Sequence, residues 1–133
     1  MKVLALGFLL IMFAGQTALQ AMPAAIHRVD REVSLRKGQK TTLRAEKITI
    51  KFDSVVEDSR CPEGTNCIWA GNAKIRLMVS KAGKRAKAVE LNTTGQMAGD
   101  ASVEAQYENY KIKLISLGSK PVYSARLQIT SAR

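Results

Sequence analysis

A repeated alternation of apolar and polar residues is the feature that most limits how this chain can fold. In the stretch 48–53, two isoleucines and a phenylalanine alternate with Thr, Lys and Asp, and the same period of two recurs in 73–80, 110–114 and 125–130. This period gives a β-strand one apolar face. No segment shows the 3.6-residue period of an amphipathic helix. The chain is therefore predicted to be all-β.

Turn signals separate these stretches. Val33 and Leu35 precede a turn at 37–39, and a second turn at 81–84 leads into a strand with Val89 and Leu91 inward. Glycines and an aspartate in 95–100 favour a loop that extends through Tyr107. We expect about seven short antiparallel strands, arranged as a small β-sandwich with Ig-like or Greek-key connections or as a barrel, with one disulfide-closed loop.

The first 21 residues have the three parts of a secretory signal peptide. Lys2 is followed by about a dozen uncharged apolar residues, and small residues favour cleavage after Ala21, with a cut after Ala18 or near Ala24 as alternatives. The apolar run is shorter than the ~20 residues of a membrane-spanning helix, so no transmembrane segment is expected once the signal is removed. We predict a signal peptide at 1–21, a flexible mature N-terminus at 22–32 and a single β-domain at 33–133.

The chain is strongly basic. Removing residues 1–21 takes away one lysine and no acid, which leaves a net charge of +9 out of +10. An anionic surface is therefore one possible partner, although the charge alone does not select it. Lysines and arginines also recur at outward strand positions, where they prevent edge-to-edge aggregation. These positions are Lys51, Lys74, Arg76, Lys87, Lys111, Lys113 and Arg126.

Both cysteines and the only tryptophan lie in the seventeen residues 57–73. In an exported monomer, which we expect here, Cys61 and Cys67 can pair only with each other. The closed loop is short, so the bridge is worth roughly 2 kcal/mol. Trp69 is expected to pack over the bridge and fill part of the core, with an exposed binding tryptophan as the alternative. Gly71 is expected to allow a bend before the next strand.

The loop is also the candidate binding site of the protein. Its acidic residues suggest a cation site, but no calcium-loop spacing is present. We favour a structural role in which Asp58 accepts backbone N–H groups and Arg60 pairs with a carboxylate. The candidate binding residues are Glu57, Asp58, Arg60, Glu63, Thr65 and Asn66.

The sequence offers little for catalysis. His27 is the only histidine and lies in the expected flexible N-terminus, and the paired cysteines leave no thiol nucleophile. Two cysteines and one distant histidine do not form a zinc site, and no phosphate-binding glycine loop occurs. The aromatic residues do not interleave with basic ones as in single-strand nucleic-acid binders. We expect no enzyme activity, no cofactor, no metal and no nucleic-acid partner.

The motif resembles that of a known group of proteins. Asp58-Ser59-Arg60-Cys61-Pro62, followed by Cys67 and then Trp69-Ala70-Gly71-Asn72-Ala73, is similar to the D-S-R-C-P…C-x-W-A-G-x-A signature of an uncharacterised family of small exported bacterial proteins and lipoproteins. The flanks around Gly38 and Tyr110 resemble that pattern too. The resemblance implies an exported β-domain and implies no activity. The lipid-attachment cysteine of many members is absent here.

These observations predict a periplasmic or secreted bacterial β-domain without enzymatic activity. Its expected role is a binding or structural module of the cell envelope, which contacts an unknown protein or envelope ligand through the Cys61–Cys67 loop. One alternative is a basic surface module that adheres to anionic envelope components. Another is an inhibitor of a secreted hydrolase that inserts the preorganised loop into a cleft.

Overall fold

The computed structural model describes residues 29–94 and 103–131. The predicted signal peptide, His27 and most of the predicted flexible segment 22–32 lie outside the described residues. The described residues begin with the buried Val29, and the first strand starts at Asp30 instead of the expected residue 33. The described part contains no helix, and hence no helix long and apolar enough to cross a membrane.

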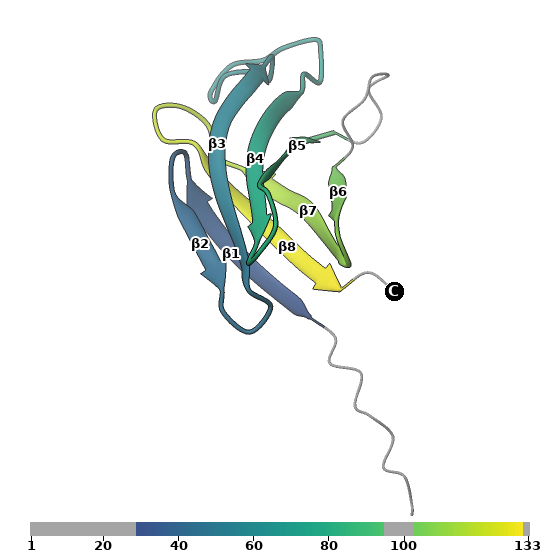
Figure 1. Cartoon of the computed structure of the whole chain (residues 1–133). Helices are drawn as coiled ribbons and strands as arrows, with labels where there is room; N and C mark the ends of the chain where they lie inside the picture. The colour runs from purple at the N-terminus through teal and green to yellow at the C-terminus, as the bar shows by residue number, and fades with distance from the viewer. Residues whose placement is uncertain (1–28, 95–102, 132–133) are drawn as a thin grey trace, which may run out of the picture.

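Eight antiparallel strands form two four-stranded sheets that face each other (Figure 1). One sheet has the order β1-β8-β7-β6 and the other β2-β3-β4-β5. The strands are β1 (Asp30–Arg36), β2 (Lys40–Leu43), β3 (Ile48–Asp58), β4 (Ala73–Lys81), β5 (Lys87–Asn92), β6 (Glu104–Tyr107), β7 (Tyr110–Leu117) and β8 (Ser124–Ser131). The predicted all-β sandwich with one disulfide is confirmed.

The connections follow an up-and-down meander. Every hydrogen-bonded strand pair joins neighbours in sequence except β1 and β8, which close the first sheet. The chain crosses between sheets after β1 and after β5. A Greek key would place a fourth strand beside the first of three consecutive ones, and the described strands do not have this order. Most paired strands are therefore adjacent in sequence, and the β1–β8 pair is the long-range exception.

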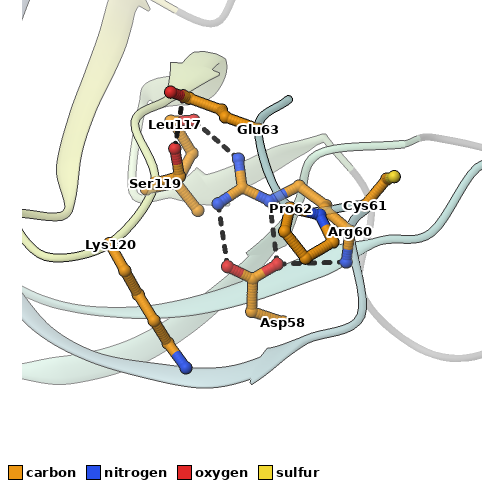
Figure 2. Close-up of a pocket in the computed structure, with 8 residues that line it drawn as sticks. All are labelled: Asp58, Arg60, Cys61, Pro62, Glu63, Leu117, Ser119 and Lys120. Carbon is orange, nitrogen blue, oxygen red and sulfur yellow. Dashed lines mark hydrogen bonds and ion pairs between the residues drawn. The ribbon is translucent and has the colours of Figure 1, made fainter. Parts of the chain in front are cut away.

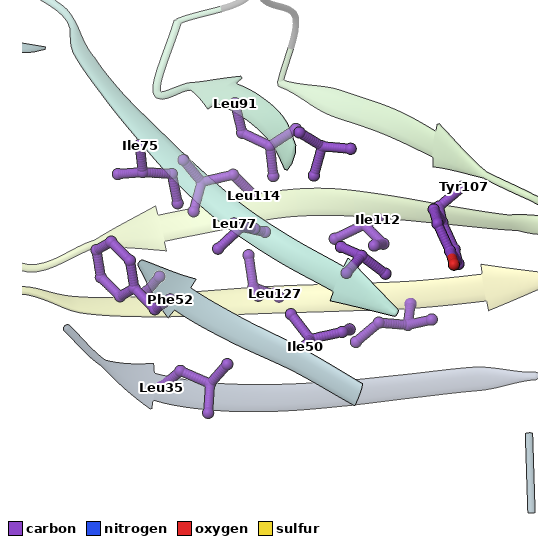
Figure 3. Packing of buried hydrophobic residues seen from close by; sticks show 14 of the residues in the cluster. Leu35, Ile50, Phe52, Ile75, Leu77, Leu91, Tyr107, Ile112, Leu114 and Leu127 are labelled. Carbon is purple, nitrogen blue, oxygen red and sulfur yellow. The ribbon is translucent and has the colours of Figure 1, made fainter. Parts of the chain in front are cut away.

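The core lies between the sheets and is made of the inward residues of each alternation (Figure 3). Ile50, Phe52 and Ile75 have no exposed surface, and Leu127 packs against them from the opposite sheet. Burying a side chain of this size contributes about 1.5–3 kcal/mol. The alternation of apolar and polar residues in the sequence therefore predicted the core residues that contribute most to stability.

Two features of the strands differ from the expectation. Residues 104–107 were predicted to be loop, but they form β6, with Tyr107 buried against the core. Bulges interrupt the pairing of β3 with β4 and of β7 with β8. The bulges rotate Val56 and Ile115 outward, which explains why these apolar side chains are 46% and 44% exposed.

The strands run between two distinct ends of the sandwich (Figure 1). One end carries the long β3–β4 connection and the β7–β8 connection. The other carries the β2–β3, β4–β5 and β6–β7 turns and the start of β1. The β1–β2 turn lies at the first end, where Lys37 N–H donates to the carbonyl of Tyr123 at 2.9 Å.

Candidate binding loop

The β3–β4 connection, residues 59–72, is called the stapled loop because the Cys61–Cys67 disulfide closes its centre. The two Cα atoms are 5.8 Å apart, so the predicted pairing is confirmed. Inside the ring, the Thr65 hydroxyl and the Thr65 N–H both donate to the carbonyl of Pro62, at 2.7 and 3.2 Å. The ring is thus fixed by its own hydrogen bonds as well as by the disulfide.

Ser59 and Asn72 close the base of the loop. Ser59 N–H donates to the Asn72 carbonyl at 2.8 Å, and Asn72 N–H donates to the Ser59 hydroxyl at 3.0 Å. Gly71 lies directly against this pair: an added Cβ would come within 2.6 Å of Arg60 Cα and closer still to the Ser59 carbonyl oxygen. Its φ of +58° also disfavours other residues. Glycine therefore fits this position without strain, whereas the bends of this segment lie at Ile68 and Trp69.

The Asn72 side chain fastens the loop to the end of β5. Its Oδ1 accepts hydrogen bonds from the Thr93 hydroxyl at 3.2 Å and from the Thr94 hydroxyl at 3.1 Å, and its Nδ2 donates to Asn92 Oδ1 at 3.1 Å. Backbone contacts join Thr93 and Ala73 as well. These contacts hold the base of the loop in one position relative to the second sheet.

Asp58 and Arg60 join the loop to the opposite sheet (Figure 2). Arg60 Nε and Nη2 each donate to one oxygen of Asp58 at 2.9 Å, a bidentate pair, and Arg60 N–H donates to Asp58 Oδ1 at 3.2 Å. Arg60 Nη1 also donates to the Leu117 carbonyl at 2.7 Å and Nη2 to the Gly118 carbonyl at 3.3 Å. The Tyr123 hydroxyl donates to Asp58 Oδ2 at 3.1 Å.

This cluster strongly favours the ionised form of Asp58. Both side chains are mostly covered, with 16% of Asp58 and 22% of Arg60 exposed. The hydrogen bonds from Arg60 outweigh the cost of burial and lower the pKa of Asp58 to about 2. The predicted roles of Asp58 as an acceptor in the turn and of Arg60 as its partner are confirmed. Because their polar atoms are occupied within the protein, these two residues hold the loop and are not free to contact a ligand.

A hollow of about 480 Å³ lies between the stapled loop and the β7–β8 connection (Figure 2). Asp58 and Arg60 form part of its wall. Glu63 forms another part and accepts a hydrogen bond from the Ser119 hydroxyl at 2.5 Å. Lys120 also lines the hollow and makes no ion pair with any described residue. Glu63 therefore bridges the two loops, and Lys120 is available to an anionic group.

The remaining candidates are spread over the loop and the strand before it. Glu57 is exposed near the end of β3, opposite Lys74 of β4. Thr65 is used inside the disulfide ring, as described above, and Asn66 is exposed. The six residues thus do not converge on one point, and only Glu63 faces the hollow without belonging to the Asp58–Arg60 pair.

Of the exposed apolar residues of the loop, Trp69 was considered for binding only as the alternative to packing in the core, and Ile68 was not considered. Ile68 is fully exposed and Trp69 is 58% exposed. The prediction that Trp69 fills part of the core is wrong, because the tryptophan lies on a connection outside the two layers. Its Nε1 donates to the Ser59 carbonyl at 3.1 Å, which fixes the ring at the surface. Ile68 and Trp69 are called the loop tip below.

The described residues hold no group of three or more His, Cys, Asp or Glu side chains that could bind a metal ion, and no free cysteine. The carboxylate of Asp58, next to the stapled loop, forms an ion pair with Arg60.

Comparisons with known proteins identify no relative. No family model, no curated protein and no solved structure matches this chain.

Proposed function

We propose that this protein is an exported, non-enzymatic β-domain of the bacterial cell envelope that binds a partner protein through the loop tip. The observation that carries the proposal is the complete exposure of Ile68 next to a half-exposed Trp69. When a partner covers these two consecutive residues, their large apolar side chains are removed from water, which favours binding. Tryptophan is also among the residues that dominate binding energy at protein interfaces.

The rigidity of the loop supports the same function. A flexible loop would lose conformational entropy on binding, whereas a preorganised loop loses little. Here the disulfide, the Ser59–Asn72 pair and the Asp58–Arg60 cluster fix the loop before any partner arrives. The motif residues therefore act as a scaffold, and the tip that they support is the part left free for recognition.

Two observations support export. A disulfide is stable outside the reducing cytoplasm, and Cys61 and Cys67 are paired in the structure. The apolar segment after Lys2 has the composition of a secretory signal. The resemblance of the motif to that of small exported bacterial proteins agrees with both.

The test compares partner capture by matched surface variants. Wild-type protein and Ile68→Ser are used to capture proteins from a periplasmic or envelope extract of a producing bacterium. Ile115→Ser is the control, because Ile115 is an exposed isoleucine on a β7 bulge and is not part of the stapled loop. We expect a partner that Ile115→Ser retains and Ile68→Ser loses, with Kd rising about tenfold or more.

Trp69→Phe adds a second measurement, since it keeps an apolar ring and removes the Nε1 donor to Ser59. Weaker binding with unchanged thermal stability would support a contact made by the tryptophan itself. Equal capture by wild type, Ile68→Ser and Trp69→Phe would contradict the proposal.

A further inference from the structure

The end of the sandwich opposite the stapled loop has an excess of positive charge. The β2–β3 and β4–β5 turns meet here, where Ala82 N–H donates to the carbonyl of Lys47 at 2.9 Å (Figure 1). Two acids, Glu46 and Glu108, lie in or beside the turns at this end. The cations at the same place are Arg44, Lys47, Lys81, Lys84, Arg85 and Lys87. We call this region the basic end.

A hollow of about 370 Å³ lies between the two turns. Four of the cations line it, namely Arg44, Lys47, Lys81 and Lys84, and no carboxylate does. A cavity wall that combines several positive charges and no negative one attracts anions. The hollow is formed by residues from β2, β3, β4 and both turns, so only the fold brings these charges together.

Three hydroxyl groups form a row along one side of the hollow. Thr42, Thr49 and Ser80 are cross-strand neighbours on β2, β3 and β4, and all three line the hollow. The hydroxyl oxygens of Thr42 and Thr49 are 2.9 Å apart, so one donates to the other. The proton of the accepting hydroxyl remains free to donate to a ligand. The row therefore supplies neutral hydrogen-bond donors beside the positive charges.

The four cations of the hollow differ in whether their charged groups have a partner within the protein. Lys81 Nζ lies 5.5 Å from the centre of the Tyr110 ring, and Lys84 Nζ is 2.6 Å from Glu108 Oε2. Arg44 and Lys47 form no ion pair with any described residue. Their charges are thus available to an incoming anion.

Lys47 also has an unusual backbone conformation. Its φ of +57° is in the left-handed region, which glycine and asparagine adopt at lower cost than lysine. Strained residues of this kind concentrate at functional sites. A glycine would suit the turn better, but it would remove one of the two unpaired cations from the hollow.

We propose that the hollow at the basic end binds a phosphate group. Phosphate oxygens accept charge-assisted hydrogen bonds from Arg and Lys and further hydrogen bonds from hydroxyls, and the hollow provides both kinds of donor. The group is either free phosphate or the headgroup of an anionic phospholipid, because both present the same oxygens. This site lies at the other end of the molecule from the loop tip and is independent of the proposed partner binding.

Titration of the full domain with inorganic phosphate, followed by amide chemical shifts at constant ionic strength, tests the proposal. Saturable shifts are expected in residues 42–49 and 80–84.

The double variant Arg44→Gln/Lys47→Gly should raise the Kd about tenfold or more, since it removes both unpaired charges. The Lys47→Gly change should also raise Tm by a few degrees, because glycine relieves the left-handed strain. Reduced binding by a more stable protein cannot be attributed to unfolding.

The matched control is Lys74→Gln/Lys113→Gln, which removes the same charge from strand positions that line neither of the two hollows described here and should bind within about twofold of wild type. A second arm measures sedimentation with vesicles of phosphatidylcholine, with or without phosphatidylglycerol. The proposal is supported if Arg44→Gln/Lys47→Gly loses binding to inorganic phosphate or to the vesicles while the control variant retains it. Binding in the titration indicates free phosphate as the ligand, and binding to the vesicles indicates a phospholipid headgroup. Absence of saturable binding in both arms, or equal losses in both double variants, would overturn it.

Discussion

The two ends of this sandwich use their residues in different ways. At one end, the stapled loop needs fourteen residues to connect β3 to β4, and most of its motif residues bind other parts of the protein. At the basic end, short turns connect the strands, and side chains such as Arg44 and Lys47 have no ion-pair partner among the described residues.

The difference shows that most of the special residues of the stapled loop fix its backbone, which leaves mainly the loop tip to contact a partner. A long connection must be fixed by its own side chains, because no strand pairing holds it. Cysteine, proline, glycine and tryptophan are the residues that do this, so they gather where the backbone is hardest to hold. A short turn is fixed by the strands it joins, and its side chains remain available for ligands.

Two glycine variants, one at each end, test this difference, and one of them is expected to cause the largest loss in the free energy of unfolding. Gly71→Ala should lower the free energy of unfolding by about 3 kcal/mol or more, because the new Cβ would overlap the Ser59 carbonyl and the φ is positive. Gly83→Ala in the β4–β5 turn also has positive φ, but nothing lies within 4 Å of the new Cβ. It should cost only about 1 kcal/mol. Urea denaturation of both variants measures the contrast, and equal losses would show that the two connections are held alike.

The next effect compares an ion pair from each end. Arg60→Lys keeps the charge but loses the bidentate pair with Asp58 and the contacts with the 117–118 carbonyls, so the free energy of unfolding should fall by about 2 kcal/mol. Lys84→Gln removes the exposed pair with Glu108 at the basic end, and the urea midpoint should not change measurably. A larger loss in Lys84→Gln than in Arg60→Lys would refute the assignment of Arg60 as the residue that holds the loop.

The smallest effect is a pH dependence that originates at the stapled end alone. The pKa of Asp58 is about 2 in the folded protein and 3.8 without its partners. The stabilisation from Asp58 is therefore complete above pH 4 and is lost as the pH falls from about 4 to 2, because the unfolded chain takes up the proton first. The loss amounts to about 1–2 kcal/mol.

Thermal denaturation of wild type and Asp58→Asn between pH 7 and pH 2 measures the contribution of the Asp58 carboxylate to stability. The difference in stability between the two proteins should narrow as the pH falls below 4. A constant difference over the whole range would mean that the Asp58 carboxylate does not stabilise the fold through its charge.

The strands that pair over long alternating stretches could be predicted from the sequence. Ile48, Ile50 and Phe52 alternate without interruption, and they are among the most deeply buried residues. In contrast, β6 has only Ala105 and Tyr107 as inward residues, and such a short pattern also fits a loop. The bulges that expose Val56 and Ile115 depend on the pairing of neighbouring strands, which a single strand pattern does not reveal.

The candidate site was predictable only where its contacts are local. Asp58 and Arg60 are two residues apart; the sequence predicted a carboxylate partner for Arg60, and the structure identifies it as Asp58. The carbonyl of Leu117 is 57 residues from Arg60 and the Tyr123 hydroxyl is 65 residues from Asp58, so nothing in the motif indicates these contacts. The exposure of Trp69 was only the alternative prediction for the same reason, since it depends on the loop lying outside the layers.

The position of Asp30 determines how the domain can be oriented on a support. Strand β1 starts at the basic end, and the stapled loop lies at the far end of the 11-residue β3 (Figure 1). A domain fused or immobilised through the residues before Asp30 would hold its loop tip roughly 30 Å above the point of attachment. The same orientation results when the basic end rests on an anionic layer, so both modes of attachment direct Ile68 and Trp69 outward.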